Sequence, residues 1–302
     1  QASILTQEAE NSLRIIENIL IHTLSIDDAV DWEKLKRFDD FSETKPVKPN
    51  NKALMEYTSE PKKETIEFTF FEKMFKSKKE KRITQNEETY KKRIIDWENE
   101  KKRIDEKNIK INEQNQENIR NWEIDVSEWE KRKDAFLEER EIFNDKIEQM
   151  KKSYLSCNPD SITEYCDMVL SNSQYPDTFP KTFEIEYVPD TKILIIEYQL
   201  PSQDNLPKLK EVKYIASKKE LKETYISESV LTKMYDDTIY KISLRTIHEI
   251  FESDVVNAIN AVSFNGWVKS INKGTGKEEN NCILSIQVQK DEFQNIDLRN
   301  ID

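Results

Sequence analysis

Two runs of large apolar residues, each with a strict seven-residue spacing, constrain this chain more than any other feature. The first run is Ile83, Tyr90, Trp97, Ile104 and Ile111, and the second is Trp122, Trp129, Phe136, Phe143 and Met150. A seven-residue apolar period is typical of a helix that buries one narrow seam against a partner. The step from the first run to the second is seven plus four residues, a stutter that keeps the seam in phase. The pattern predicts a coiled-coil arm over residues 80–156, about 110 Å long at roughly 1.5 Å per residue, whose seam joins protomers into a homo-oligomer. A hairpin that folds near the polar residues 112–118 is the alternative.

Composition agrees with an elongated, solvated helix. Charged residues make up 35% of the 302 residues, and only three glycines occur. The segment 76–152 holds 21 basic and 20 acidic residues, so nearly all of the net charge of −12 lies outside the arm. A positive field over the whole protein, which would gather nucleic acid, is therefore excluded, and any DNA contact must be local. We expect the seam tryptophans to pack, with stacking on bases as the less favoured alternative.

Several chemistries lack the residues they need. Cys157, Cys166 and Cys282 form no CxxC pair, and His22 and His248 are far apart in sequence, so no metal site is expected in this chain. We expect His248 to be a packed residue within an apolar stretch. The sequence shows no secretory leader and no apolar run long enough to cross a bilayer, which predicts a cytoplasmic protein without a membrane partner.

The residues before the arm, 1–79, predict a helix, a connector and an aromatic cluster. Apolar spacing over residues 3–24 indicates an amphipathic helix, and a short helix follows. Pro46, Pro49 and Pro61 then predict an extended linker or strap across residues 42–65. Four phenylalanines lie between residues 66 and 75. We interpret them as a plug at the base of the coiled coil, with a partner-docking patch as the alternative.

The residues after the arm, 157–302, predict a compact α+β domain. A helix follows Asn158, and the segments TFEIEYV and ILIIEYQL predict two strands joined by a tight turn. A third strand is expected at 211–216, then a long core helix from Ser227 to about Ile259, then a closing hairpin. The expected fold class is therefore α+β with a long coiled-coil arm.

One constellation could carry catalysis. Metal-dependent nucleases of the PD-(D/E)xK type place an Asp before one strand, and an acidic residue and a Lys two positions apart on the next. Asp190, Glu211 and Lys213 fit this order. The D/E-x-Lys tripeptide recurs elsewhere in the chain, and Pro-Asp is ordinary turn chemistry. We favour a solvent-exposed turn at Asp190, with the catalytic interpretation as the alternative.

Several whole segments carry a family resemblance. They are IDDAVDWEKLK, FFEKMFKSKKEKR, KILIIEYQLP, LKEVKYIASKKELKE, LRTIHEIFESDVVNAINAVSFNGWV and CILSIQVQKDEF. Together they resemble the N-terminal region of bacterial restriction endonucleases with a C-terminal Mrr-like domain. The resemblance implies a DNA-cleaving enzyme of phage defence, with its Mg²⁺-dependent nuclease domain beyond Asp302.

Three functional hypotheses follow. The leading one makes this chain the oligomerising and regulatory region of such an endonuclease, inert as a nuclease alone and reaching DNA through its nuclease domain. The second makes the α+β domain itself a divergent metal-dependent nuclease. The third is a non-enzymatic coiled-coil scaffold that binds a protein trigger.

Overall fold

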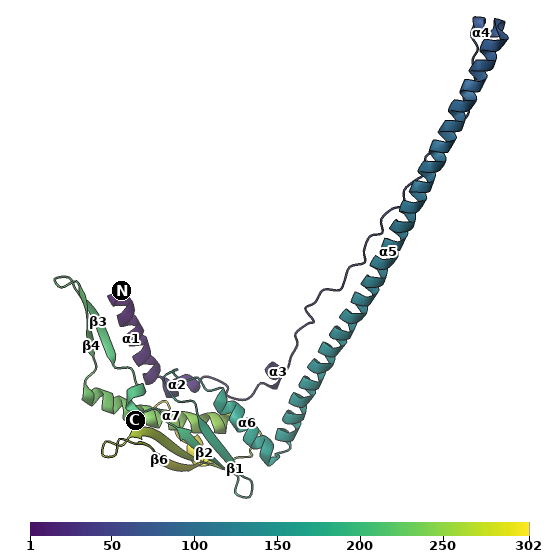
Figure 1. Cartoon of the computed structure of the whole chain (residues 1–302). Coiled ribbons are helices and arrows are strands. Elements are labelled where there is room, and N and C mark those ends of the chain that lie inside the picture. The colour runs from purple at the N-terminus through teal and green to yellow at the C-terminus, as the bar shows by residue number, and fades with distance from the viewer. Residues whose placement is uncertain (302) are drawn as a thin grey trace. The chain divides into compact units, whose positions relative to one another are not determined.

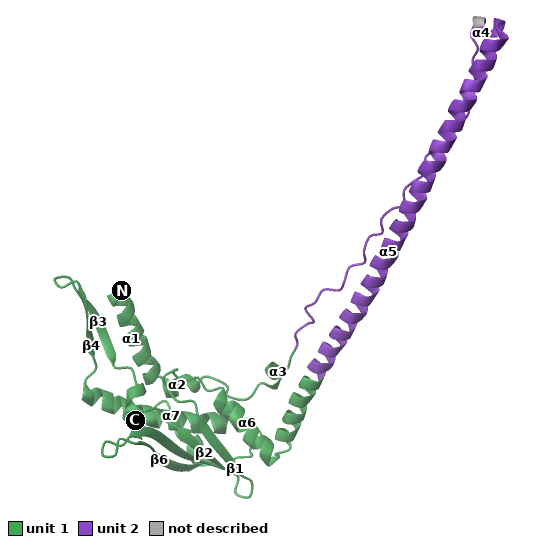
Figure 2. Cartoon of the chain, in the orientation of Figure 1, with its two compact units in different colours: residues 1–37, 142–302 green, residues 38–141 purple. Residues whose placement is uncertain are grey.

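The chain folds as two compact units. The computed structural model describes residues 1–301, apart from the side chain of Phe71, and Figure 1 labels its helices and strands. Unit 1 comprises residues 1–37 and 142–302, and unit 2 comprises residues 38–141 (Figure 2). The first residues of the chain therefore fold with the C-terminal half, and the middle of the chain forms a separate body.

A four-stranded mixed sheet is the centre of unit 1. Its strands are β1 (Phe183–Val188), β2 (Ile193–Gln199), β5 (Ala261–Ile271) and β6 (Glu278–Gln289). They lie in the order β1-β2-β5-β6, with β1–β2 and β5–β6 antiparallel and β2–β5 parallel. Both predicted hairpins are confirmed. Alternate residues of β2 (Leu194, Ile196 and Tyr198) are buried, as expected for a central strand with one face on the core.

The parallel pair β2–β5 requires a crossover, and helix α7 (Glu228–Ser253) is its main part. The core helix was predicted to extend to about Ile259, and this prediction was wrong by six residues. The helix ends because the Asp254 carboxylate accepts hydrogen bonds from the backbone N–H groups of Ala258 (2.9 Å) and Ile259 (3.1 Å). Those bonds hold the chain in a turn, and Ile259 is buried in the core outside the helix.

The third predicted strand exists, but it belongs to a separate two-stranded sheet. Strand β3 (Leu209–Ile215) pairs antiparallel with β4 (Glu220–Tyr225), which the sequence pattern did not predict. Strand β4 is exposed along its whole length, and its only apolar or aromatic residues are Leu221 and Tyr225, so it has no run of alternating apolar residues to detect. The Thr6 hydroxyl on α1 bonds to the backbone N–H and C=O of Val212, which attaches this hairpin to the N-terminal helix.

The predicted N-terminal helix is divided in two. Helix α1 (Ala2–Glu17) and helix α2 (Ile19–Thr23) are separated by Asn18, whose side-chain amide donates to the Arg14 carbonyl at 2.8 Å. Ile16, Ile19 and Leu20 join the core cluster. The remaining elements of unit 1 are α3 (Trp32–Leu35), α6 (Pro159–Ser171), η1 (Gln203–Asn205) and α8 (Lys290–Gln294).

The long helix α5 (Lys76–Leu155) has 80 residues and contains both seven-residue runs. It continues without interruption through the polar residues 112–118. A short helix, α4 (Phe70–Met74), precedes it. The α+β architecture with one long helix and a C-terminal sheet module is therefore confirmed.

Candidate functional sites

An extended strap, residues 38–69, runs antiparallel along helix α5. It contains neither helix nor strand, and Figure 2 shows it beside the helix in unit 2. Its direction follows from three hydrogen-bonded pairs. Glu43 pairs with Trp129, Pro46 with Trp122, and Thr58 with Trp97. Residue numbers therefore increase along the strap in the direction in which they decrease along the helix. The surface that the seven-residue pattern marks is thus in contact with the same chain.

The three arm tryptophans bind the strap backbone. Each indole N–H donates to a strap carbonyl, at 2.8 Å for Trp97, 3.0 Å for Trp122 and 2.9 Å for Trp129. An extended chain has no internal partners for its carbonyls, and the indole N–H supplies one. The tryptophans therefore contact the strap through hydrogen bonds that fix its register on the helix.

Asparagine side chains form a second set of contacts. The Asn115 amide accepts from the Lys52 N–H and donates to the Lys52 C=O, both at 2.9 Å. The Asn108 amide likewise accepts from the Met55 N–H at 2.8 Å and donates to the Met55 C=O at 3.1 Å. Each asparagine thus provides one acceptor and one donor to the backbone of a single strap residue, as a residue of a neighbouring β-strand does. We call each such pair of hydrogen bonds a clamp.

Helix and strap share a repeat length. Seven residues separate the clamps at Asn108 and Asn115, and three residues separate Lys52 from Met55. Trp122 and Trp129 are also seven residues apart, and their strap partners Pro46 and Glu43 are three residues apart. Seven helical residues rise about 10.5 Å, and three residues of extended or polyproline II chain span roughly 9–10.5 Å. A seven-residue pattern on a helix can therefore bind an extended chain as well as a second helix.

Aromatic and charged side chains reinforce the contact. Phe41 packs against Trp129 and Phe136, with ring centroids 5.8 and 5.6 Å apart. The Arg132 guanidinium donates to the Glu43 carboxylate from Nε at 3.0 Å and from Nη2 at 2.9 Å. The Lys45 ammonium lies 5.5 Å from the Trp129 ring centroid. This end of the strap is held by packing and charge together.

Other predicted seam residues differ in burial. Ile104 is buried and Phe143 is exposed, with the Arg37 guanidinium 5.9 Å from its ring centroid. Ile83, Tyr90, Ile111 and Met150 are half-buried. The sequence interpretation missed Asn108 and Asn115 as binding residues. Their seven-residue separation in phase with the apolar runs was the signal that could have found them.

The proposed nuclease residues are distributed over both sheets of unit 1. Asp190 lies exposed in the β1–β2 turn, whereas Glu211 and Lys213 lie on β3 of the two-stranded sheet. The Lys213 ammonium and the Glu211 carboxylate form an ion pair of 2.9 Å on a largely exposed surface. The structure therefore brings the second and third residues together, and they contact each other.

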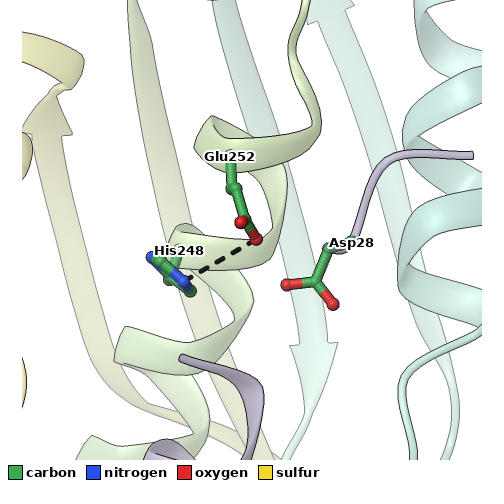
Figure 3. Close-up of side chains that lie close together, drawn as sticks. All are labelled: Asp28, His248 and Glu252. Carbon is green, nitrogen blue, oxygen red and sulfur yellow. Dashed lines mark ion pairs between the residues drawn. The ribbon is translucent and has the colours of Figure 1, made fainter. Parts of the chain in front are cut away.

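A different group of ionisable residues converges where the loop before α3 meets α7. Asp28, His248 and Glu252 each offer one ligand atom, and these atoms lie within 4.8 Å of one another (Figure 3). His248 and Glu252 are four residues apart on α7, so they share a helix face, with His248 Nε2 3.8 Å from the Glu252 carboxylate. An imidazole and two carboxylates are donors that divalent transition metals accept. In this structure they contact one another.

A buried network supports the cluster. The Thr23 hydroxyl lies 3.1 Å from both the Asp28 and the Glu249 carboxylates. Glu249 accepts a hydrogen bond from Arg245 Nε at 2.6 Å and another from the Ser173 hydroxyl. Thr23 lies on α2, Arg245 and Glu249 lie on α7, and Ser173 follows α6. The network therefore links helix α2 to the core of unit 1.

Burial shifts the protonation of the cluster. It raises the pKa of Asp28 to about 6, and the nearby Glu252 carboxylate adds to the shift. Burial lowers the pKa of His248, against the attraction of Asp28 and Glu249. The folded state thus disfavours charge on both groups. The cluster unites residues separated by more than 200 positions, which no sequence spacing could have indicated.

Comparisons with known proteins yield no identification. No protein-family model, no curated protein and no solved structure matches this chain. None of the helices within the described residues is both long and apolar enough to cross a bilayer.

Proposed function

We propose that this chain is a non-catalytic positioning and regulatory region of an Mrr-like restriction endonuclease. In this role the strapped helix acts as a stiff arm, and cleavage of DNA belongs to a Mg²⁺-dependent nuclease domain outside the chain. The segment resemblance supplies the class of enzyme. The strapped arm is the observation that carries the positioning role.

The clamps explain how the arm would work as a spacer. A single helix with alternating charges has little tertiary packing to hold it straight, whereas a helix tied to a strap at repeated points resists bending and local unfolding. Five strap residues form backbone hydrogen bonds with an indole or amide side chain of α5, and all of these side chains lie in unit 2. A stiff spacer fixes a distance between attached domains, as positioning requires.

Self-association is part of the proposal, and it uses a face that the strap leaves exposed. The exposed isoleucines of α5 are Ile95, Ile109, Ile124 and Ile142. At about 100° per residue they fall within roughly 60° of one another on the helix, and Asn115 lies on the opposite side. A second protomer could therefore pair along this face while the strap stays in place.

The rival proposal makes Asp190, Glu211 and Lys213 a nuclease site. A metal site would need both carboxylates to converge on one ion, with oxygens about 2.1 Å from Mg²⁺. The ion pair between Glu211 and Lys213, and the location of Asp190 in the turn of another sheet, favour the non-catalytic proposal.

Incubation of the purified chain with supercoiled plasmid and Mg²⁺ or Mn²⁺ separates the two proposals. We expect no nicking or linearisation. Metal-dependent cleavage that disappears in Asp190→Ala, with Asp177→Ala as the matched exposed-aspartate control, would replace our proposal with the rival one.

A further inference from the structure

The end of unit 2 where the strap turns into α5 exposes a compact apolar group. Phe70 is 76% exposed, Met74 64% and Phe75 48%. Phe70 and Met74 are four residues apart on α4, so they share one helix face. Thr69 immediately precedes this helix, and its N–H and hydroxyl both donate to the Glu72 carboxylate, at 3.0 and 2.9 Å. A formed helix therefore presents the apolar group to solvent.

Six basic residues lie in the same stretch of the chain as this group. They are Lys73, Lys76, Lys78, Lys79, Lys81 and Arg82, all exposed. Residues 70–82 contain only two acidic residues, so this segment is locally basic in a chain whose net charge is −12. The Lys78 ammonium lies 5.6 Å from the Phe75 ring centroid, and Lys79 lies 5.2 Å from that of Phe68. Charge and apolar surface are thus joined in one patch, residues 68–82, called the arm tip below.

The position of the lysines opposes helix stability. The first turn of α5 contains lysines and no acidic residue. The N-terminus of a helix carries partial positive charge and favours acidic side chains. The exposed apolar group is also unfavourable in water. Both costs would be removed together by a partner that is anionic and also offers apolar volume.

We propose that the arm tip binds peripherally to an anionic lipid surface. Phe70, Met74 and Phe75 enter the boundary between headgroups and acyl chains, and the lysines approach the lipid phosphates. Peripheral binding of this kind needs no helix that spans the bilayer.

Two features favour a lipid surface over nucleic acid. Five of the six basic residues are lysines, which act as point charges, whereas arginine predominates where phosphates are read by paired hydrogen bonds. The apolar group also contains Met74 on the same face as Phe70. Base stacking requires flat aromatic platforms, and a thioether side chain does not provide one.

Co-sedimentation of the purified chain with vesicles tests this inference. Vesicles of phosphatidylcholine alone are compared with vesicles containing 30% phosphatidylglycerol, at low and high salt, so that the zwitterionic vesicles control for charge. We expect binding to the anionic vesicles only, weakened by salt. Phe70→Ser with Phe75→Ser, and separately Lys78→Glu with Lys79→Glu, should each weaken binding by about tenfold or more.

Matched controls change similar exposed residues elsewhere in unit 2. They are Val47→Ser with Leu54→Ser on the strap, and Lys107→Glu with Lys110→Glu on α5, and we expect vesicle binding to be retained. Circular dichroism verifies that all variants keep their helix content. Equal binding to both kinds of vesicle, or unchanged binding by the tip variants, would overturn the inference. Binding to a single-stranded or duplex oligonucleotide in the absence of vesicle binding would overturn it in favour of nucleic acid. None of these results depends on plasmid cleavage.

Discussion

At the residue scale, the stability of unit 1 depends on ionisable side chains in partly buried surroundings. Asp28 is half-buried beside Glu252, and this environment raises its pKa to about 6. Since its ordinary pKa is 3.8, the folded state binds a proton more tightly than the unfolded state does. Its contribution to stability is therefore most favourable below pH 3.8 and declines as the pH rises through 6.

Asp28→Asn should remove this loss of stability at high pH, because the amide does not ionise. The amide removes a charge that faces Glu252, and its oxygen can still accept from Thr23. We expect a higher melting temperature than the parent at pH 7.5, and a difference that shrinks towards pH 4.5. Asp27→Asn, on an exposed neighbour, is the control. Thermal unfolding monitored by circular dichroism gives the comparison, and a parent more stable than Asp28→Asn at pH 7.5 would contradict this electrostatic account.

Asn115 tests a single clamp. Asn115→Ala removes both hydrogen bonds to Lys52, a loss of about 1 kcal/mol once water replaces them. Local opening of the strap should then be about fivefold more frequent. Because trypsin cleaves after Lys52, the rate of cleavage at this site reports the opening. We expect faster cleavage than in Asn121→Ala, an exposed asparagine on the same helix, and equal rates would argue against the clamp.

At the element scale, α7 is the helix on which unit 1 is built. It packs against α2, α6 and the sheet, and it carries Arg245, His248, Glu249 and Glu252 of the polar network and cluster. Its burial follows from a wide apolar stripe that the sequence displayed clearly.

Phe251→Ala should strongly destabilise unit 1. The ring is buried and lies 5.6 Å from the Phe293 ring, so its removal leaves a cavity worth about 3–5 kcal/mol. Tyr240→Ala, an exposed aromatic on the same helix, should cost far less. Chemical denaturation of the whole chain measures both, and similar losses for the two variants would mean that this helix face is misplaced.

Elements also show what the sequence could predict. The seven-residue runs, the hairpin turn at Pro189 and the helix start at Ser227 are local signals, and each one led to the correct element. Strand β4 lacked a local signal because four of its six residues are polar and all six are exposed. No local signal identified the strap as the partner of α5 either. An apolar stripe on a helix indicates that a partner covers it, but does not specify whether that partner is a helix or an extended chain. The Asp28 cluster depends on tertiary contacts between distant segments, which no local pattern records.

At the scale of the whole molecule, the two faces of α5 have separate roles in our account. The tryptophan and asparagine face holds the strap, and the isoleucine face is proposed to pair protomers. Ile109→Glu with Ile124→Glu should therefore reduce the mass measured by light scattering. Trp129→Glu with Phe136→Glu should release the strap and leave the oligomer intact. A lower mass for the Trp129, Phe136 variant, with an unchanged mass for the Ile109, Ile124 variant, would show that protomers associate through the seven-residue seam.

The strap covers the seven-residue seam of its own helix, and an electron–electron distance measurement can test this contact within one chain. Spin labels at Glu56→Cys and Lys107→Cys, in a chain with the exposed Cys157 and Cys282 replaced by Ser, flank the clamp between Met55 and Asn108. We expect one short, narrow distance that persists when the labelled chain is diluted with excess unlabelled protein. A broad, long distribution would show that the strap is detached, and a short distance that disappears on dilution would show that the strap comes from another chain.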